Sequence, residues 1–455
     1  MVIDGLRALQ HRGQEAWGIA LPGSRPFRWL GLITDEIQAA QSLSESAKSE
    51  MAIGHTRYST VGSTVFENVQ PIQIGEEFSI AHNGTISDTS KIERSISKEF
   101  DIPEWASDTT IIGLRLMQIL RENNGKWFES FSKLSKEISG AYCFVILTKN
   151  KELFAVRDEN GFRPLCIGWN KKNQTHIIAS ESCALSMLDA ELVRDVKPGE
   201  IIKIDGKNIR SHIFKETNNH AHCSFEYTYF AHPSSTIENV SVYQARKNVG
   251  KILAELYKVK GDVVIPVPDS ARPAALGFSE ASRIPIEEGL MKDRYGKRGG
   301  LRSFIEPEQK ERIEINRRII AIEQTVRDKE IILIDDSIVR GTSSKRMIET
   351  LKKAGAKKIK LLVTFPPLRY PCYAGIDFPT SEELIVNNVA DNNSKIEEIN
   401  EKLSQELGIE FVGYNTLEGL SKGLKMAKNE LCTSCVTGDY SCLDIDPQYT
   451  DRMKK

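Results

Sequence analysis

The sequence lacks the features that would direct it to a membrane or to nucleic acid. Its longest apolar runs, such as IILI at 331–334, are far shorter than the roughly 20 residues that a membrane-spanning helix needs. The charges nearly cancel, with 61 Lys and Arg against 62 Asp and Glu, so there is neither a basic field for nucleic acid nor an acidic tail. No low-complexity tract, repeat or secretory leader is visible in the 455 residues. We therefore expect a cytoplasmic protein of two or three domains.

Cysteine is scarce, and the eight residues argue against a disulfide framework in a chain without a leader. Three of them stand in apolar surroundings and are expected to be small buried residues: Cys143, Cys166 and Cys183. Four others lie in different surroundings and include a CxxC pair: Cys223, Cys372, Cys432 and Cys435. Four thiolates can hold either zinc or an iron–sulfur cluster, and their spacing alone does not choose between the two.

The two halves of the chain differ in their pattern of elements. Up to about residue 215, short strand-like runs follow one another closely, and only 108–123 and the segment near 126–139 are clearly helical. This texture predicts a largely antiparallel α+β domain, with the polar stretch 215–222 as a linker. From about residue 240, long helical patterns alternate with buried-strand runs, which is the βαβ pattern of a parallel sheet.

The most specific motif is EIILIDDSIVRGTSSKRMIETLKKAGA at 330–356. An apolar strand ends in two carboxylates, Asp335 and Asp336, and an Arg-Gly loop then leads into hydroxyl residues that open an amphipathic helix. The strand end places the carboxylates in the crevice where open α/β sheets bind ligands, and the loop and helix start suit a phosphate. The acids can hold ribose hydroxyls and, through water, magnesium. A purely structural connection would not require a doubled acid before this turn.

This loop, DDSIVRGTS, resembles the phosphoribosyl pyrophosphate (PRPP) loop of type I phosphoribosyltransferases. With LQHRGQE, GHTRYST, AHNGTISD, ASDT, VPDS and the four cysteines, the sequence resembles the glutamine PRPP amidotransferases from its first residues to about 440. The resemblance implies an α+β N-terminal-nucleophile glutaminase domain, a sandwich of antiparallel sheets with helices, at 1–222. An α/β type I phosphoribosyltransferase domain would follow at 223–400, with a C-terminal helical tail carrying cluster cysteines at 401–455.

The implied activity is that of a glycosyltransferase (pentosyltransferase) of de novo purine biosynthesis. Ammonia released from glutamine would displace pyrophosphate from PRPP and give 5-phosphoribosylamine. In the first domain, the resemblance assigns Arg57 to the α-carboxylate of glutamine and Asp108 to its α-ammonium group. It assigns Asn83 and Gly84 to an oxyanion hole. An isolated Asn-Gly would be better explained as a turn, but the order and company of the motifs favour the functional interpretation.

In the second domain, Ser270, Asp335 and Asp336 match residues at the magnesium ion, and the two acids also match those at the ribose. The residues that match the phosphate loop are Ser337, Arg340, Gly341, Thr342, Ser343 and Ser344. LMKDRYGKRGGLRSFIEP resembles a lid over PRPP, although about four extra residues separate its two halves, relative to the family pattern. The lid candidates are Lys292, Arg294, Tyr295 and Arg302.

The resemblance also implies cofactors and partners. It favours a structural 4Fe-4S cluster over zinc, with four ligands: Cys223, Cys372, Cys432 and Cys435. Cys442 would then have no ligand role. Mg²⁺ would accompany PRPP. The implied partners are PRPP, glutamine or ammonia, purine nucleotides as feedback inhibitors, and further copies of the chain in a homo-oligomer, a tetramer or a dimer.

The family's glutaminase nucleophile, an amino-terminal cysteine whose own amine serves as base, is not found in the sequence. It would lie one strand upstream of LRALQHRGQ, and the opening MVIDGLRALQHRGQEAWGIAL is typical of a helix end, a turn and a strand that continue a preceding element. Either the first methionine is internal to a longer protein, or the chain uses free ammonia or is a non-catalytic PRPP-binding regulator. The glutamine-specific motifs favour the first explanation.

Overall fold

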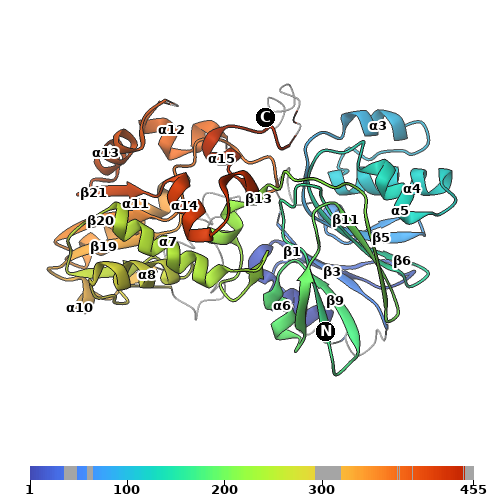
Figure 1. Cartoon of the computed structure of the whole chain (residues 1–455), viewed down its shortest axis with the longest axis horizontal. Helices are drawn as coiled ribbons and strands as arrows, with labels where there is room; N and C mark the ends of the chain where they lie inside the picture. Colours follow the sequence, from blue (N-terminus) through green and yellow to red (C-terminus); the bar gives the residue numbers. More distant parts are fainter. Residues whose placement is uncertain are drawn as a thin grey trace. The chain divides into compact units, whose positions relative to one another are not determined.

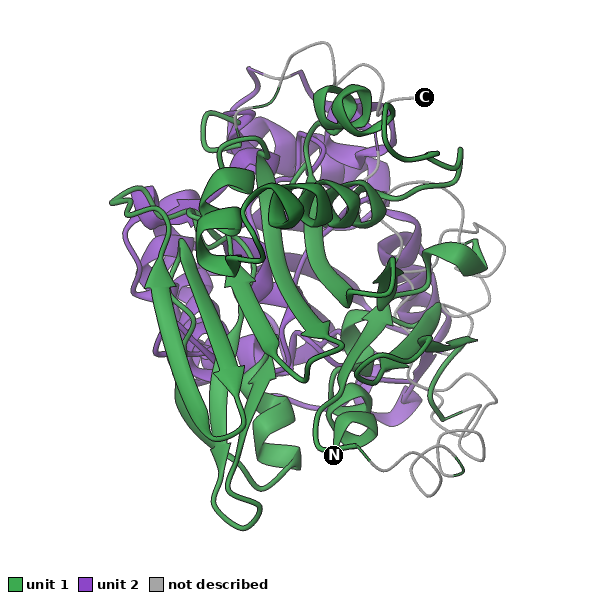
Figure 2. Ribbon diagram, turned by 90° about the vertical axis from the view of Figure 1, so that its right-hand side faces the viewer, with its two compact units in different colours: residues 1–222, 373–377, 440–455 green, residues 223–372, 378–439 purple. Residues whose placement is uncertain are grey.

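The structure is a computed structural model, and its description covers residues 1–34, 42, 49–58, 65–292, 319–376, 378, 380–391, 393–443 and 445. The chain divides into two compact units (Figures 1 and 2). Unit 1 comprises residues 1–222, 373–377 and 440–455, and unit 2 comprises residues 223–372 and 378–439. Within the described residues, no helix is both long and apolar enough to cross a membrane.

Unit 1, green in Figure 2, is built on antiparallel sheets. Its largest sheet has the strand order β12 (Asn208–Ile213), β11 (Glu200–Asp205), β7 (Leu153–Arg157), β6 (Gly140–Thr148), β5 (Phe78–Ile86), β4 (Ile72–Ile74). Two three-stranded sheets have the orders β2 (Phe27–Leu30), β1 (Ala16–Ala20), β3 (Ile53–Arg57) and β10 (Glu191–Asp195), β8 (Cys166–Asn170), β9 (Thr175–Ala179). Neighbouring strands are antiparallel throughout, which confirms the α+β class expected for this half.

The helices of unit 1 cover its sheets. They are α1 (Val2–Ala8), η1 (Gln10–Arg12), η2 (Phe66–Asn68), α3 (Ser90–Ile96), α4 (Asp108–Glu122), α5 (Trp127–Leu134) and α6 (Ser182–Met187). Helix α4 begins after Ser107, whose side chain accepts a hydrogen bond from the backbone N–H of Thr110, as a helix N-cap does. Its apolar residues recur on one face, and Ile112, Leu116 and Ile119 are fully buried in a core shared with β5 and β6. The cap and the apolar face thus fix where α4 begins and which side it buries.

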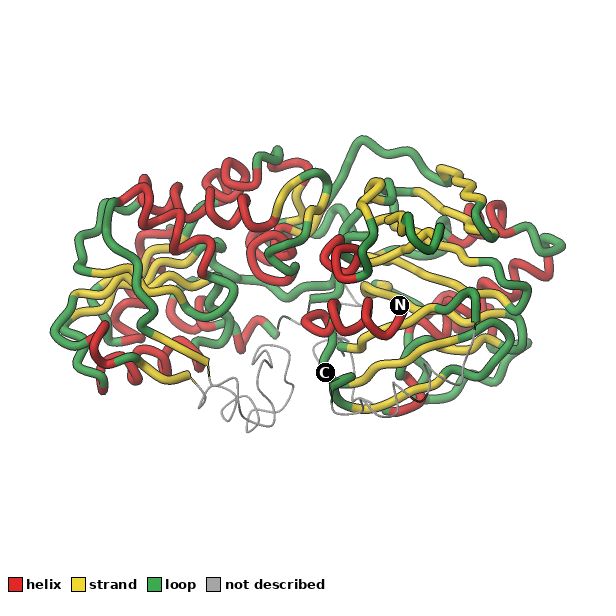
Figure 3. The backbone as a smooth tube through the Cα atoms, turned by 90° about the horizontal axis from the view of Figure 1, so that it is seen from below, coloured by secondary structure: helices red, strands yellow, loops and turns green. Residues whose placement is uncertain are grey.

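Unit 2 contains a parallel sheet with the strand order β16 (Val263–Pro266), β19 (Glu330–Asp335), β20 (Lys358–Val363), β21 (Phe411–Tyr414). Helices lie on both sides of these strands (Figure 3). The larger ones are α7 (Val242–Leu256), α8 (Arg272–Ser282), α11 (Thr342–Lys353), α13 (Ile396–Leu407) and α14 (Leu417–Leu424). Residues 331–334 are all fully buried, as expected for a strand covered on both faces. The predicted α/β class is therefore confirmed.

Several short elements complete the described chain. They are β13 (His222–Cys223), η3 (Glu226–Phe230), β14 (Thr236–Ile237), β15 (Val240–Ser241), β17 (Leu290–Lys292), β18 (Ile319–Ala321), α10 (Glu323–Val326), η4 (Ser381–Glu383), α12 (Ile385–Val389), η5 (Lys428–Glu430), β22 (Leu431–Cys432) and α15 (Ser434–Thr437). The predicted lid lies between β17 and β18. Lys292 ends β17, whereas Arg294, Tyr295 and Arg302 fall outside the described residues.

The sequence analysis expected a separate C-terminal tail from residue 401, but the structure shows no boundary between units at this position. Residue 401 lies inside α13, and β21 is the fourth strand of the parallel sheet. Leu403, Leu407 and Val412 belong to the same apolar core as β19 and β20. From residue 378 the chain stays in unit 2 up to Asp439. The strand FVGY at 411–414 is short and lies between two helical patterns, which is why the sequence analysis did not find it.

Candidate active site

Three elements of unit 1 bring the predicted glutamine-binding residues together. Arg57 is the last residue of β3 and is 7% exposed, while Asp108 is the first residue of α4. Burial lowers the pKa of Arg57, and the negative charges of Glu15 and Asp108 oppose that shift. Arg57 and Asp108 are therefore close enough to interact electrostatically, with one cation and one anion in the same region.

Asp108 is held as a carboxylate. Its Oδ2 accepts a hydrogen bond from the backbone N–H of Ile86 at 3.1 Å, and its Oδ1 accepts one from the N–H of Thr109 at 2.7 Å. His82 Nδ1 lies 3.6 Å from Oδ2. Burial acts to raise the pKa of Asp108, but His82 and the two N–H groups outweigh it and hold the pKa below its ordinary value. A negative charge at this position can receive an ammonium group.

Asn83 and Gly84 lie on β5, opposite Cys143 and Tyr142 of β6. Arg163 Nε donates to Asn83 Oδ1 at 3.5 Å, which sets the orientation of the side-chain amide. Gly84 has a φ of +142°, and a Cβ at this position would lie 1.9 Å from the carbonyl oxygen of Ala141. Only glycine fits here. Because Gly84 has no side chain, its backbone N–H is not covered by a Cβ at the position next to Asn83.

Several buried polar atoms in this region make no hydrogen bond among the described residues, and they include Nη1 of Arg57 and Nδ2 of Asn83. A buried donor left unpaired costs about 1–3 kcal/mol, so such groups call for an explanation. Arg57 Nη1 can bind a carboxylate, and Asn83 Nδ2 can donate to an oxyanion. The two orphan donors belong to the residues that the sequence analysis assigned to glutamine.

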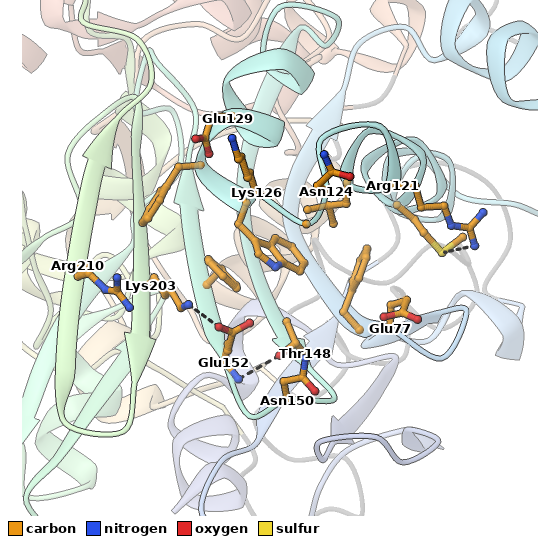
Figure 4. Close-up of a pocket in the computed structure, with 17 residues that line it drawn as sticks. Glu77, Arg121, Asn124, Lys126, Glu129, Thr148, Asn150, Glu152, Lys203 and Arg210 are labelled. Carbon is orange, nitrogen blue, oxygen red and sulfur yellow. Dashed lines mark hydrogen bonds and ion pairs between the residues drawn. The ribbon is translucent and has the colours of Figure 1, made fainter.

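A separate cavity of about 610 Å³ lies at the other end of α4 and β5 (Figure 4). Phe78 opens β5, and Arg121 stands near the end of α4, whereas Gly84 and Asp108 lie at the opposite ends of these two elements. Two of its charged side chains have partners of their own: Lys203 donates to Glu152, as Figure 4 shows, and Arg121 pairs with a carboxylate outside the cavity. This cavity therefore plays no part in the glutamine-binding arrangement.

In unit 2, the doubled acid lies at the carboxyl edge of the parallel sheet. Asp335 ends β19, and Asp335 and Asp336 are 6% and 5% exposed. Ser270, in the loop after β16, donates to Asp336 Oδ2, and Ser337 donates to Oδ1 at 3.1 Å. The pKa of Asp335 is raised well above its ordinary value by burial and by the charge of Asp336, while Lys292 acts in the opposite direction. Two adjacent buried carboxylates of this kind could together hold a cation.

The phosphate loop follows directly after these acids. Gly341 has a φ of +76° and caps the amino end of α11, where its carbonyl accepts from the N–H of Lys345 at 2.9 Å. Ser344 is buried and Thr342 is exposed. Arg340 Nε donates to Glu383 Oε2 at 2.5 Å, so its guanidinium lies against η4. The helix amino end, with its N–H groups and hydroxyls, faces the carboxyl edge and suits an anion.

The four cysteines singled out by the sequence all belong to unit 2 and converge. Burial raises the pKa of Cys435 well above its ordinary value, and the thiols of Cys372, Cys432 and Cys223 raise it further. Ser224 donates to the carbonyl of Cys432 at 2.8 Å, which joins the first cysteine segment to the last. The other three thiols thus all lie near Cys435, an arrangement that could hold a metal centre. Cys143 and Cys166 are buried among apolar side chains, as predicted. Cys183 is also buried, but its Sγ lies beside the His11 ring and the Glu181 carboxylate, so the expected apolar surroundings are wrong for this residue.

The chain matches proteins of known identity over nearly its whole length. It is 40% identical to an amidophosphoribosyltransferase from Methanocaldococcus jannaschii and 37% identical to that of Bacillus subtilis, covering 93% and 90% of those proteins with 96% of its own residues. The chain belongs to the amidophosphoribosyltransferase family. Residues 55–187 match a family model described as a glutamine amidotransferase domain.

Solved structures agree with this assignment. The glutamine PRPP amidotransferase from B. subtilis, complexed with ADP and GMP, matches with a TM-score of 0.82 and 35% identity, covering 96% of this chain and 93% of that one. A structure described as the allosteric regulatory enzyme of purine biosynthesis matches with a TM-score of 0.83, at 35% identity, covering 96% of this chain and 92% of that one. The protein is therefore an enzyme, a pentosyltransferase of purine biosynthesis, and the alternative of a non-catalytic regulator is not favoured.

Sequence reasoning missed three residues that shape these amidophosphoribosyltransferase sites. His82 contacts Asp108, Arg163 orients Asn83, and Glu383 holds Arg340. His82 could have been found from the sequence, because it stands next to Asn83 in the motif AHNG at 81–84. Arg163 and Glu383 are separated from their partners by 80 and 43 residues, and no local pattern marks them. Tertiary contacts of this length require the folded structure.

Proposed function

We propose that unit 2 forms 5-phosphoribosylamine at the carboxyl edge of its parallel sheet. The observation that carries this assignment is the buried pair Asp335 and Asp336 directly before a glycine-capped helix start. Asp335 and Asp336 would hold the ribose hydroxyls of PRPP, while backbone N–H groups and hydroxyls of the loop would hold its 5-phosphate: Ser337, Arg340, Gly341, Thr342, Ser343 and Ser344. Ammonia would then attack C1 of the ribose as pyrophosphate leaves.

Mg²⁺ fits the donor set of this edge. Ser270, Asp335 and Asp336 offer only oxygen ligands, which Mg²⁺ prefers, and two adjacent buried carboxylates supply the charge. A bound Mg²⁺ would neutralise charge on the departing pyrophosphate. Lys292, whose Nζ lies 3.7 Å from Oδ2 of Asp269, would add a positive charge near the carboxylate of Asp335. The protein side chains would contribute mainly by positioning the reactants and excluding water.

In unit 1, Arg57 would bind the α-carboxylate of glutamine and Asp108 its α-ammonium group. The orphan Nη1 of Arg57 and the carboxylate state of Asp108 support these roles. Asn83, with its unpaired Nδ2, and Gly84 would stabilise the oxyanion that forms when the amide is attacked. Arg163 would keep Nδ2 directed at that oxygen, because it occupies the carbonyl end of the Asn83 amide.

The four-cysteine centre would hold a structural 4Fe-4S cluster. Three of the cysteines, Cys223, Cys372 and Cys432, lie near the thiol of the fourth, Cys435, and both Cys223 and Cys435 are buried, which supports this assignment. A cluster would tie three distant segments of unit 2 together. As regulators we propose purine nucleotides, by analogy with the B. subtilis structure that contains ADP and GMP. We further propose a homo-oligomer, a tetramer or a dimer.

Replacing Arg57 by Lys tests the glutamine site. The substitution keeps the charge but removes the two-pronged guanidinium, so we expect glutamine affinity, measured by calorimetry, to fall about tenfold or more. PRPP-dependent pyrophosphate release with ammonia should stay unchanged, because Arg57 belongs to unit 1. Arg121→Lys, on an exposed arginine paired with Glu99, is the matched control and should bind glutamine normally. Unaltered glutamine binding by Arg57→Lys would refute the assignment.

A further inference from the structure

The phosphate loop of unit 2 is supported from outside by one short segment. This segment, residues 381–389, consists of η4 and α12 and is called the brace below. Arg340 Nε donates to Glu383 Oε2 of the brace at 2.5 Å, and the N–H of Ile385 donates to the carbonyl of Val339 at 2.9 Å. The two bonds hold consecutive residues of the loop, one through a side chain and one through the backbone.

Gly341 makes the third contact with the brace. Its φ of +76° is a left-handed conformation, and a Cβ on it would lie 2.2 Å from Cδ1 of Ile385. Ile385 is itself buried in the core of unit 2. The left-handed turn that starts α11 is therefore pressed against a fixed apolar side chain. Because this turn sets the direction of the first N–H groups of α11, the brace determines where a bound phosphate can sit.

Asn387 keeps the brace in place. Its Nδ2 donates to the carbonyl of Ser381 at 2.8 Å and to the carbonyl of Arg369 at 2.8 Å. The first bond closes the brace on itself, and the second ties it to the segment that follows β20. Glu383, at one end of the brace, is half exposed and Arg340 is mostly buried, so their ion pair is only partly screened by water.

We propose that Glu383 and Asn387 are positioning residues for PRPP binding, acting through Arg340 and the Gly341 turn. This inference rests on the proposed function of the phosphate loop. Neither side chain needs to touch PRPP. Glu383 holds the Arg340 guanidinium against η4. The phosphate then meets preset backbone N–H groups, and the substrate does not have to order the loop.

Glu383→Gln tests the proposal in the ammonia-dependent reaction. We expect KM for PRPP to rise about three- to tenfold, while kcat stays within about twofold of the wild-type value. The ion pair orders the loop equally in the substrate complex and in the transition state, so its loss weakens binding without slowing the chemical step. The dissociation constant for PRPP with Mg²⁺, measured by calorimetry, should rise by the same factor. Asn387→Ala should shift both quantities in the same direction, and Glu383→Asp, which keeps the charge, should recover part of the affinity.

Glu406→Gln is the matched control. Glu406 forms an ion pair at 2.5 Å with Lys345, which lies on α11, the helix that follows the loop. Within the described part of the chain, its side chain makes no hydrogen bond or ion pair with loop residues 337–341. Its KM should equal that of the wild type. A wild-type KM in Glu383→Gln, a lower KM, or a fall in kcat alone would overturn the proposal. If wild-type protein itself bound no PRPP, the proposed function would fail instead.

Discussion

Asp336→Asn is expected to lower PRPP-dependent pyrophosphate release with ammonia by about a hundred- to a thousandfold. The carboxylate is almost fully buried and accepts hydrogen bonds from Ser270 and Ser337, so its position is fixed by its neighbours. Asparagine has nearly the same size but offers one acceptor oxygen and no charge. It would therefore remove the negative charge from the cation site while leaving the packing of β19 intact. Stopped or coupled assays of pyrophosphate measure the effect.

The matched control for this variant is Asp328→Asn. Asp328 is exposed and has a φ of +61°, a conformation that asparagine accepts readily. It lies just before β19, at the end of the strand remote from Asp336. We expect normal activity from it. If Asp336→Asn kept more than about a tenth of the wild-type rate, the assignment of the transferase chemistry to this carboxylate pair would be incorrect.

Cys435→Ser is expected to have the largest effect on stability. Cys435 is deeply buried and its backbone carbonyl accepts from the N–H groups of Arg369 and Tyr370 at 3.0 and 3.1 Å. If the four cysteines hold the proposed cluster, losing one ligand should remove the iron. Because metal binding contributes directly to folding, the melting temperature should then fall by about 10 °C or more. Iron and acid-labile sulfide, determined in anaerobically purified protein, give the direct readout.

Cys442→Ser provides the control for this loss. Cys442 belongs to unit 1 and is not one of the four proposed ligands, so its replacement should leave iron content and melting temperature unchanged. A wild-type protein that carried one zinc ion per chain and no iron would contradict the cluster assignment but not the four-cysteine centre. Full iron content in Cys435→Ser would contradict both.

The sequence predicted the chemical core of unit 2 because its residues are neighbours in the chain. Asp335 and Asp336 end an apolar strand, and the turn and helix that follow are contiguous with them. The physical consequence, a carboxylate pair at the carboxyl edge of a parallel sheet, needs only the strand–loop–helix pattern. Arg57, Asn83 and Asp108 were predicted from a family resemblance, and the structure shows what holds them near one another: β3, β5 and α4.

What the sequence could not predict depends on contacts between distant residues. Arg163 reaches Asn83 from a loop 80 positions away, and Glu383 reaches Arg340 across 43 positions. Charged residues in loops are usually solvated, so neither stood out. The strand β21 was missed for another reason: four residues between two helices carry too little periodic signal, and only the neighbouring strand β20 gives FVGY its extended form.

The most direct measurement is pyrophosphate release by the 455-residue chain, assayed anaerobically with PRPP, Mg²⁺ and saturating ammonia. The account predicts turnover that requires both PRPP and Mg²⁺ and that yields 5-phosphoribosylamine in equal amount. It also predicts that Asp336→Asn lowers this turnover by about a hundredfold or more, whereas Arg57→Lys preserves it. A folded, iron-containing protein that released no pyrophosphate under these conditions would contradict the assignment of the transferase reaction to unit 2.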